Sequence, residues 1–179
     1  DAARGLAKSA ELPFIPVFYK LRGERAFQGP NPDERLKSIS RNIYLVPGVV
    51  TSVRDRLLLV VDDSIVRGNN IKRERELLNE AGLSRTLHAV YTPPIGVVGE
   101  DGIERGCLFG IDMPPEDKFF ARNRSNDEMN RLAGGQVVYL TVEGMLSVYK
   151  KLGISEDKLC TYCLGGDYPY AKCGHDKIT

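Results

Sequence analysis

Hydrophobic residues recur along this chain in short blocks whose spacing alternates between strand-like and helix-like. The clearest strand-like block is residues 57–61, a run of branched apolar residues that ends abruptly at two aspartates. Continuous apolar runs of this length are typical of strands buried on both faces of a parallel sheet. We therefore expect residues 57–61 to form the central buried strand of the fold.

Other blocks predict further elements on both sides of this strand. Helices are expected at residues 2–11, 33–43, 69–81, 126–133 and 143–152, and strands at residues 14–18, 86–91 and 136–140. Asn69 and Asn70 are expected to cap the third of these helices, and Asn126 the fourth. Residues 96–106 hold four glycines and three acids, which indicates an exposed hairpin or loop. The alternation predicts an α/β domain with a mostly parallel central sheet flanked by helices.

Length and composition limit the class of protein. A chain of 179 residues is ample for one domain but short for two. We expect that domain to cover residues 1–152, and residues 153–179 to form a cysteine-bearing tail packed on it. The net charge of +1 gives no broad footprint for nucleic acid or membrane. With four cysteines and no apolar run of membrane-spanning length, we expect a cytoplasmic protein without nucleic-acid or membrane partners.

Candidate chemistry lies directly after the predicted central strand. Ligands of open α/β sheets bind beyond the carboxyl ends of the strands, and a glycine-containing turn that leads into a helix cradles phosphate with its N–H groups. Paired aspartates beside such a turn suit sugar hydroxyls and Mg²⁺. The sequence therefore predicts a sugar-phosphate site. Its residues are Asp62, Asp63, Ser64, Ile65, Val66, Arg67, Gly68, Asn69 and Asn70.

Residues 57–70 resemble the phosphoribosyl pyrophosphate (PRPP) motif of type I phosphoribosyltransferases, and the core Val-Asp-Asp-Ser-Ile-Val-Arg-Gly is similar to that of glutamine PRPP amidotransferases. Further segments resemble landmarks of the same family in the same order. These segments are residues 14–27, 92–95, 110–114, 138–144, 160–163 and 166–169. The resemblance spans nearly the whole chain and implies the type I phosphoribosyltransferase fold. The implied reaction converts PRPP, glutamine and water to 5-phosphoribosylamine, glutamate and pyrophosphate, the first step of de novo purine biosynthesis.

The resemblance also implies roles for individual residues. Lys20, Arg22 and Arg25 lie on a segment similar to the family's flexible loop, which closes over the pyrophosphate. Asp62 and Asp63 are implied to bind the ribose hydroxyls, directly or through Mg²⁺, while the loop that follows holds the 5′-phosphate.

The sequence departs from the family's pattern at Asn69 and Asn70, where two threonines are common. Asparagine side chains can still donate hydrogen bonds to a phosphate. The substitution therefore leaves the phosphate site in place but changes its side-chain donors.

Three cysteines match positions that bind a [4Fe–4S] cluster in cluster-bearing members of the family: Cys107, Cys160 and Cys163. The fourth ligand of those members lies upstream of the segment present here, and Cys173 is an additional thiol that either substitutes for it or lies free. Other interpretations stay open, namely a buried core thiol at Cys107, an idle pair at Cys160 and Cys163, and zinc bound with Cys173 or His175.

The resemblance further implies an upstream pyrophosphate loop, a strand and a glutaminase domain that are absent from this sequence, so we expect an N-terminally incomplete phosphoribosyltransferase domain. It implies ammonia delivered by a glutaminase domain, inhibition by purine nucleotides and a homo-oligomer. Two alternatives remain. One is a non-catalytic PRPP- or nucleotide-sensing regulatory protein, favoured by Asn69 and Asn70; the other is a nucleobase phosphoribosyltransferase, which would need a base-binding hood that the sequence does not show.

Overall fold

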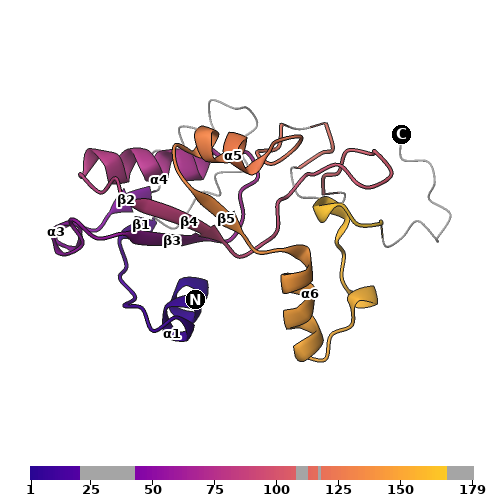
Figure 1. The fold of residues 1–179 in the computed structure, drawn as a ribbon, viewed down its shortest axis with the longest axis horizontal. Coiled ribbons are helices and arrows are strands. Elements are labelled where there is room, and N and C mark those ends of the chain that lie inside the picture. The colour runs from indigo at the N-terminus through magenta and orange to yellow at the C-terminus, as the bar shows by residue number, and fades with distance from the viewer. Residues whose placement is uncertain (21–42, 108–112, 117, 169–179) are drawn as a thin grey trace.

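The computed structural model describes residues 1–20, 43–107, 113–116 and 118–168 (Figure 1). Most of the helix predicted at residues 33–43 lies outside the described residues, and so do Arg22 and Arg25. No helix in the part of the chain that the structure describes has the length and apolar character needed to cross a bilayer.

The described elements alternate along the chain much as the hydrophobic pattern predicts. The helices are α1 (Ala2–Ser9), α3 (Val49–Ser52), α4 (Asn69–Glu80), α5 (Asn126–Ala133) and α6 (Val142–Lys151), followed by the 3₁₀ turns η2 (Glu156–Lys158) and η3 (Tyr162–Leu164). The strands are β1 (Phe18–Lys20), β2 (Ile43–Leu45), β3 (Leu58–Asp62), β4 (Thr86–Val90) and β5 (Val137–Tyr139). The strand predicted at residues 14–18 begins only at Phe18.

Strands β3, β4 and β5 form a parallel sheet in which Val61 lies opposite Ala89, and Ala89 opposite Val138. A separate antiparallel pair joins β1 and β2. The larger sheet is flanked by helices, with α4 and α5 on one side and α1 and α6 on the other (Figure 1). The predicted α/β architecture is therefore confirmed.

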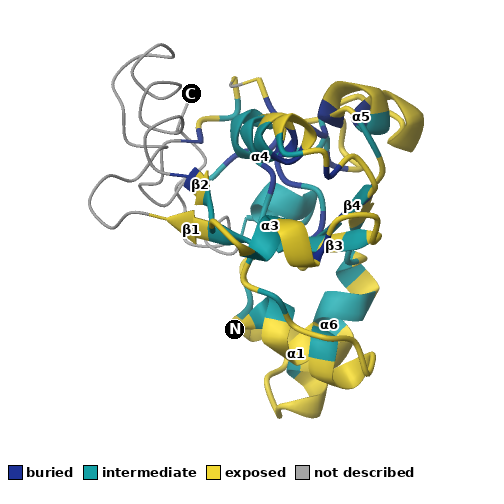
Figure 2. Ribbon diagram, turned by 90° about the vertical axis from the view of Figure 1, so that its left-hand side faces the viewer, coloured by how far each residue is buried: buried dark blue, intermediate teal, exposed yellow. Residues whose placement is uncertain are grey.

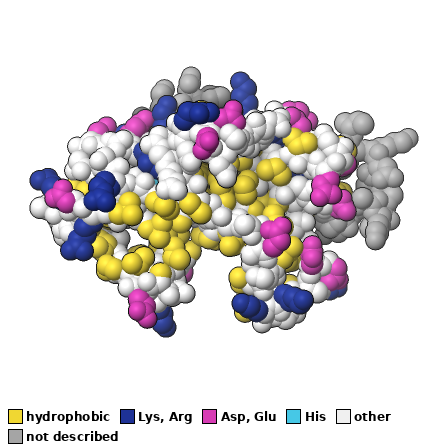
Figure 3. Space-filling view, viewed as in Figure 1, with side chains coloured by type: hydrophobic (Ala, Val, Ile, Leu, Met, Phe, Trp, Pro, Cys, Tyr) yellow, Lys and Arg dark blue, Asp and Glu magenta, His cyan; other side chains and the backbone are white. Residues whose placement is uncertain are grey.

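The prediction that residues 57–61 form a central strand buried on both faces is wrong. In the described sheet β4 is central and β3 lies at an edge. Leu57 is 63% and Leu59 40% exposed, whereas Leu58 and Val60 pack in a core cluster with Leu78 of α4. Figure 3 shows hydrophobic side chains gathered over the sheet between α1 and α6. The face of β3 that carries Leu59 is therefore only partly covered, although α1 contacts this strand.

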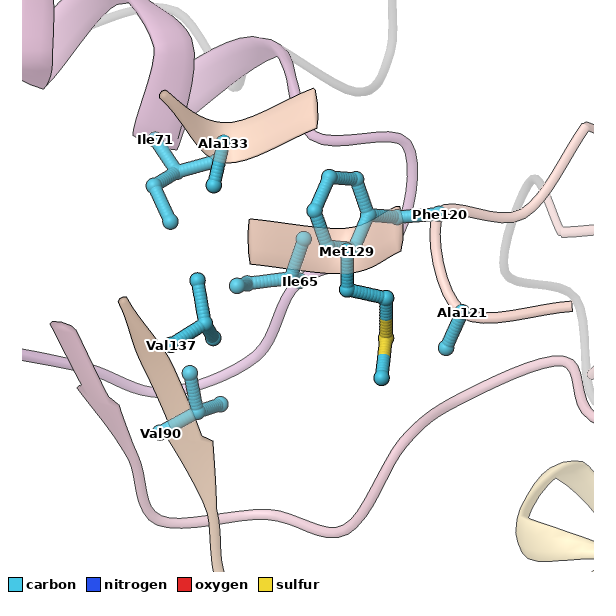
Figure 4. Packing of buried hydrophobic residues seen from close by; sticks show 8 residues of the cluster. All are labelled: Ile65, Ile71, Val90, Phe120, Ala121, Met129, Ala133 and Val137. Carbon is cyan, nitrogen blue, oxygen red and sulfur yellow. The ribbon is translucent and has the colours of Figure 1, made fainter. Parts of the chain in front are cut away.

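The buried core lies between the sheet and the helices α4 and α5 (Figure 2). Figure 4 shows its largest cluster, in which side chains from β4, β5, both helices and two loops meet. The cluster consists of Ile65, Ile71, Val90, Phe120, Ala121, Met129, Ala133 and Val137. Ile65 and Phe120 come from loops, so this core fixes loop positions as well as helices.

Two of the predicted helix caps are displaced by one residue. Gly68 is the N-cap of α4, in a left-handed conformation with φ of 85°, so Asn69 and Asn70 are the first helical residues. Ser125 is the N-cap of α5 and forms a capping box with Glu128, in which each side chain accepts from the other's backbone N–H. Both corrections have the same cause, because an asparagine just inside a helix and one at its cap look alike in sequence.

Residues 96–106 form a hairpin closed by a bridge between Val98 and Glu104, as expected, but part of it is buried. The Arg105 side chain donates to the carbonyl of Gly166 over 3.3 Å and lies over the Tyr162 ring at 4.8 Å. The backbone N–H of Gly96 donates to the carbonyl of Cys163 over 2.7 Å. The hairpin is therefore a packing surface for residues 162–166 and not a free loop.

Candidate functional site

The predicted acids lie at the carboxyl edge of the parallel sheet. Asp62 is the last residue of β3, and its carboxylate accepts from the backbone N–H of Asp63 over 2.9 Å. The Tyr91 N–H, just after β4, donates to the Asp62 carbonyl over 3.2 Å, and the Thr92 hydroxyl donates to the Asp63 carbonyl over 2.8 Å. The ends of β3 and β4 are thus joined at the edge where α/β sheets bind ligands.

The loop that follows is anchored from the core side. Ile65 is buried in the core cluster that contains Phe120, so its side chain fixes the loop to the core. The carbonyl of Val66 accepts from the Phe120 N–H over 2.7 Å, and that of Gly68 accepts from the Lys72 N–H over 3.2 Å. Gly68 is required by its positive φ, which side-chain-bearing residues rarely adopt. The loop shape therefore depends on residues far away in sequence.

The N-terminus of α4 is suited to an anion. Within the described residues no side chain caps this helix, and its first turn contains no acidic residue. The first backbone N–H groups of a helix have no intrahelical partner and lie at the positive end of the helix dipole. These groups, with the loop before them, form the kind of backbone cradle that binds phosphate.

Negative charge is concentrated on the strand side of this cradle. Burial, the nearby charge of Glu74 and contact with Asp63 raise the pKa of Asp62 to about 7. Burial likewise raises the pKa of Glu74 to about 7, although the charge of Lys20 opposes the shift and that of Asp63 adds to it. The carboxylates of Asp62, Asp63 and Glu74 therefore lie near one another, and Lys20 is the described lysine whose charge acts on Glu74. This arrangement favours binding a cation.

A contact between two buried polar groups behind the site was not predicted from the sequence. His88 of β4 is completely buried, and its Nε2 lies 3.5 Å from Oε2 of Glu74. Burial and the charge of Arg75 lower the pKa of His88 to about 4, so the imidazole is neutral at pH 7 and the contact is not an ion pair. The sequence did contain a signal that Arg75 is buried behind the site. Arg75 lies four residues after Ile71 and three before Leu78, on the core face of α4.

The raised pKa of Asp62 predicts that the site destabilises the ligand-free chain at high pH. A carboxyl whose pKa rises from 3.8 to about 7 on folding contributes stability at low pH, which is lost as the pH rises from about 4 through 7. We expect Asp62→Asn to unfold like the parent in urea at pH 4 but to be more stable at pH 8, by on the order of 2 kcal/mol. An equal difference at both pH values would contradict this prediction.

Two of the predicted cluster cysteines share one packing cluster. Cys107 and Cys163 are half-buried against Ile95, Met113 and Phe119, while Cys160 is exposed. Burial first, and then the charges of the two other thiols, raise the pKa of Cys163 to about 11. Across the described ranges no three His, Cys, Asp or Glu side chains are arranged to hold a metal ion. Cys173 and His175 lie outside the described residues.

Comparison with known proteins gives a consistent result. An amidophosphoribosyltransferase of Archaeoglobus fulgidus is 30% identical over 177 residues, which cover 98% of this chain and 36% of the relative. A Bacillus subtilis amidophosphoribosyltransferase is 30% identical, over 94% of this chain and 34% of the relative. The chain is similar to amidophosphoribosyltransferases over nearly its whole length. No protein-family model matches it.

The comparison with solved structures gives the same family as the comparison with relatives in sequence. The glutamine PRPP amidotransferase of B. subtilis, complexed with ADP and GMP, superposes with a TM-score of 0.70 at 29% identity, covering 94% of this chain and 35% of that one. A structure described as the allosteric regulatory enzyme of purine biosynthesis gives a TM-score of 0.68 at 30% identity, covering 92% and 34%. These matches confirm the expected fold and family resemblance. The chain spans about a third of the length of the amidophosphoribosyltransferases that it matches.

Proposed function

We propose that this chain supplies the PRPP site of an amidophosphoribosyltransferase, whose full reaction converts PRPP, glutamine and water to 5-phosphoribosylamine, glutamate and pyrophosphate in purine biosynthesis. The observation that supports this most is the position of Asp62 and Asp63 beside the N-terminus of α4, which no side chain of the described residues caps. The two aspartates suit sugar hydroxyls, and the N-terminus of α4 suits a phosphate. Residues 1–152 form the proposed phosphoribosyltransferase domain, and residues 153–179 its tail.

In the proposed reaction the residues act by positioning and by charge. The backbone of residues 64–70 holds the 5′-phosphate, and the two aspartates hold the ribose hydroxyls. Departure of pyrophosphate leaves positive charge on the ribose ring, and fixed carboxylates in a partly buried site stabilise that charge. Ammonia is itself a nucleophile, so the chain needs no general base to activate it. Asn69 and Asn70 add side-chain donors at the start of α4.

The acids of the site fit Mg²⁺ when substrate completes its coordination. Mg²⁺ is usually held by one or two carboxylates together with phosphate oxygens and water. Asp62 and Asp63 would hold the ion, which would neutralise charge on the substrate. The pKa of Asp62, raised to about 7, shows how strongly the unliganded site disfavours a bare carboxylate.

Lys20, Arg22 and Arg25 belong to the proposed flexible loop. Lys20 ends β1, and its charge acts on Glu74, so the base of this loop lies on the carboxylate side of the site. Arg22 and Arg25 lie outside the described residues. Closure of such a loop would exclude water and bring positive charge to the leaving pyrophosphate.

A [4Fe–4S] cluster is proposed at Cys107, Cys160 and Cys163, with the fourth ligand from Cys173 or from elsewhere in the complete protein. The support is the effect of Cys107 and Cys160 on the pKa of Cys163 and the shared packing of Cys107 and Cys163. Binding iron would require these thiols to deprotonate. The role is structural, because the proposed reaction transfers no electrons.

The cluster predicts a measurable iron content. Anaerobically prepared protein is expected to be brown, with about four irons per chain and charge-transfer absorption that Cys163→Ser abolishes. The same measurement on Cys173→Ser shows whether Cys173 is the fourth ligand. A colourless, fully folded anaerobic preparation without iron would remove the cluster from the proposal.

The resemblance to amidophosphoribosyltransferases is also the basis for proposing three partners. These are ammonia from a glutaminase domain, purine nucleotides as inhibitors, and further copies of the chain in a homo-oligomer. The B. subtilis structure complexed with ADP and GMP supports the second of these. The cytoplasm is the proposed compartment.

The experiment that tests the function is pyrophosphate release from PRPP with Mg²⁺, with and without ammonium. Release that requires both PRPP and ammonium supports the transferase. PRPP binding without ammonium-dependent release would instead favour the regulatory alternative, a PRPP sensor on the same fold.

A further inference from the structure

Two adjacent phenylalanines, Phe119 and Phe120, are buried in core clusters near the site. Phe119 is 1% and Phe120 6% exposed, yet the two side chains enter different clusters. Phe119 packs with Ile95 and Met113 on the hairpin side. Phe120 belongs to the core cluster beneath the phosphate loop, where its ring lies close to Ile65 and Met129 (Figure 4).

Phe120 contacts the phosphate loop through both its backbone and its ring. Its N–H donates to the carbonyl of Val66 over 2.7 Å. A Cβ atom added to Gly68 would lie 2.5 Å from Cδ2 and 3.1 Å from Cε2 of this ring. The ring therefore occupies the space that a side chain at the N-cap of α4 would need.

The position of Phe120 is itself fixed. A single nitrogen of the Arg124 guanidinium, Nη1, donates to the carbonyls of both Phe119 and Phe120 over 2.7 Å. The ring is held within a cluster that includes residues of α4, α5 and the sheet. The contacts with Val66 and Gly68 thus connect the loop to the packed core of the domain.

We propose that Phe120 is a positioning residue for the phosphate loop, holding Val66 and Gly68 so that the loop N–H groups converge on the 5′-phosphate of PRPP. This inference rests on the proposed function for its ligand. Most of the proposed donors are backbone N–H groups, whose positions are fixed by the loop, so a small shift of the loop weakens several hydrogen bonds together. A residue without a polar side-chain atom would thereby determine phosphate affinity.

The test compares Phe120→Leu with Leu78→Ala, a truncation in a separate core cluster that does not touch the loop. We expect Phe120→Leu to speed amide hydrogen exchange in residues 64–70 about tenfold, and to weaken PRPP binding with Mg²⁺ by about tenfold. Leu78→Ala should lower the unfolding temperature yet leave loop exchange and PRPP affinity within about twofold of the parent. Equal effects of the two variants on loop exchange would overturn the proposal.

A reciprocal change tests the same contact from the loop side. Gly68→Ala places a methyl group against the Phe120 ring and should also weaken PRPP binding, through the clash and the positive φ. Adding Phe120→Leu removes the clash, so the double variant should lose less affinity than the product of the two single losses. Strictly multiplicative losses would contradict a direct contact.

Failure of the inference and failure of the proposed function can be told apart. If the unsubstituted chain binds no PRPP, the proposed ligand is wrong, while the exchange rates of residues 64–70 still decide whether Phe120 holds the loop. If PRPP binds normally to Phe120→Leu and loop exchange is unchanged, the proposed function stands and the positioning role is wrong.

Discussion

Replacing Asp62 and Asp63 together by asparagine is expected to weaken PRPP binding by at least about 100-fold, because two charge-assisted interactions with ribose hydroxyls or Mg²⁺ are lost. Titration calorimetry with Mg²⁺ measures the change directly. We expect the ligand-free variant to remain folded, since burial destabilises the ionised form of Asp62 and its replacement should stabilise the chain above pH 7.

A control for this double variant removes the same charge elsewhere. Asp127→Asn combined with Glu80→Gln neutralises two exposed carboxylates, on α5 and at the end of α4. We expect PRPP affinity within about twofold of the parent for this pair, because exposed charges at a distance are screened. Comparable losses in both double variants would show that net charge, and not the acidic pair, determines binding.

The largest effect on stability is expected at Arg75. This buried side chain donates to the Thr86 hydroxyl over 2.9 Å and to the carbonyls of Gly134 over 3.3 Å and Gln136 over 3.1 Å. Arg75→Ala removes the donors and leaves buried acceptors unpaired at the junction of α4 with β4 and β5. We expect the free energy of unfolding in urea to fall by about 3 to 4 kcal/mol.

Arg73 provides the matched control two residues earlier on the same helix. Its Nη1 lies 3.4 Å from Oε2 of Glu76, whose side chain is 48% exposed. The Arg73 side chain is 27% exposed, and partly exposed pairs of this kind contribute little, so Arg73→Ala should change stability by less than about 1 kcal/mol. If Arg75→Ala were equally mild, its buried hydrogen bonds would not hold α4 to the sheet.

The sequence predicted the order of the elements and the place of the acidic pair better than it predicted how the elements pack. The order of elements, the parallel sheet and the place of Asp62 at a strand end follow from local patterns, namely apolar periodicity and an abrupt change to acids. The exposure of Leu57 and Leu59 could not be predicted, because an apolar run looks the same whether one or both faces are covered. The edge position of β3 could not be predicted either, because strand order depends on the whole sheet and not on the sequence of one strand.

The interactions that shape the site were missed for a related reason. Phe120 meets Gly68 across more than fifty positions of sequence, and no local pattern records which aromatic residue covers a given glycine. The contact of Glu74 with His88 joins a helix to a strand and requires the packed fold to exist first. The cap at Gly68 in place of Asn69 is a smaller error, since propensity places helix ends only to within one or two residues.

The most direct test of the central claim is residue-resolved NMR of the chain during titration with PRPP and Mg²⁺. Binding in the proposed cradle predicts saturable shifts of the backbone amides of residues 62–70, with ribose 5-phosphate shifting the amides of residues 64–70 in the same direction. Saturable binding whose largest shifts lie elsewhere, with residues 62–70 unchanged, would contradict it.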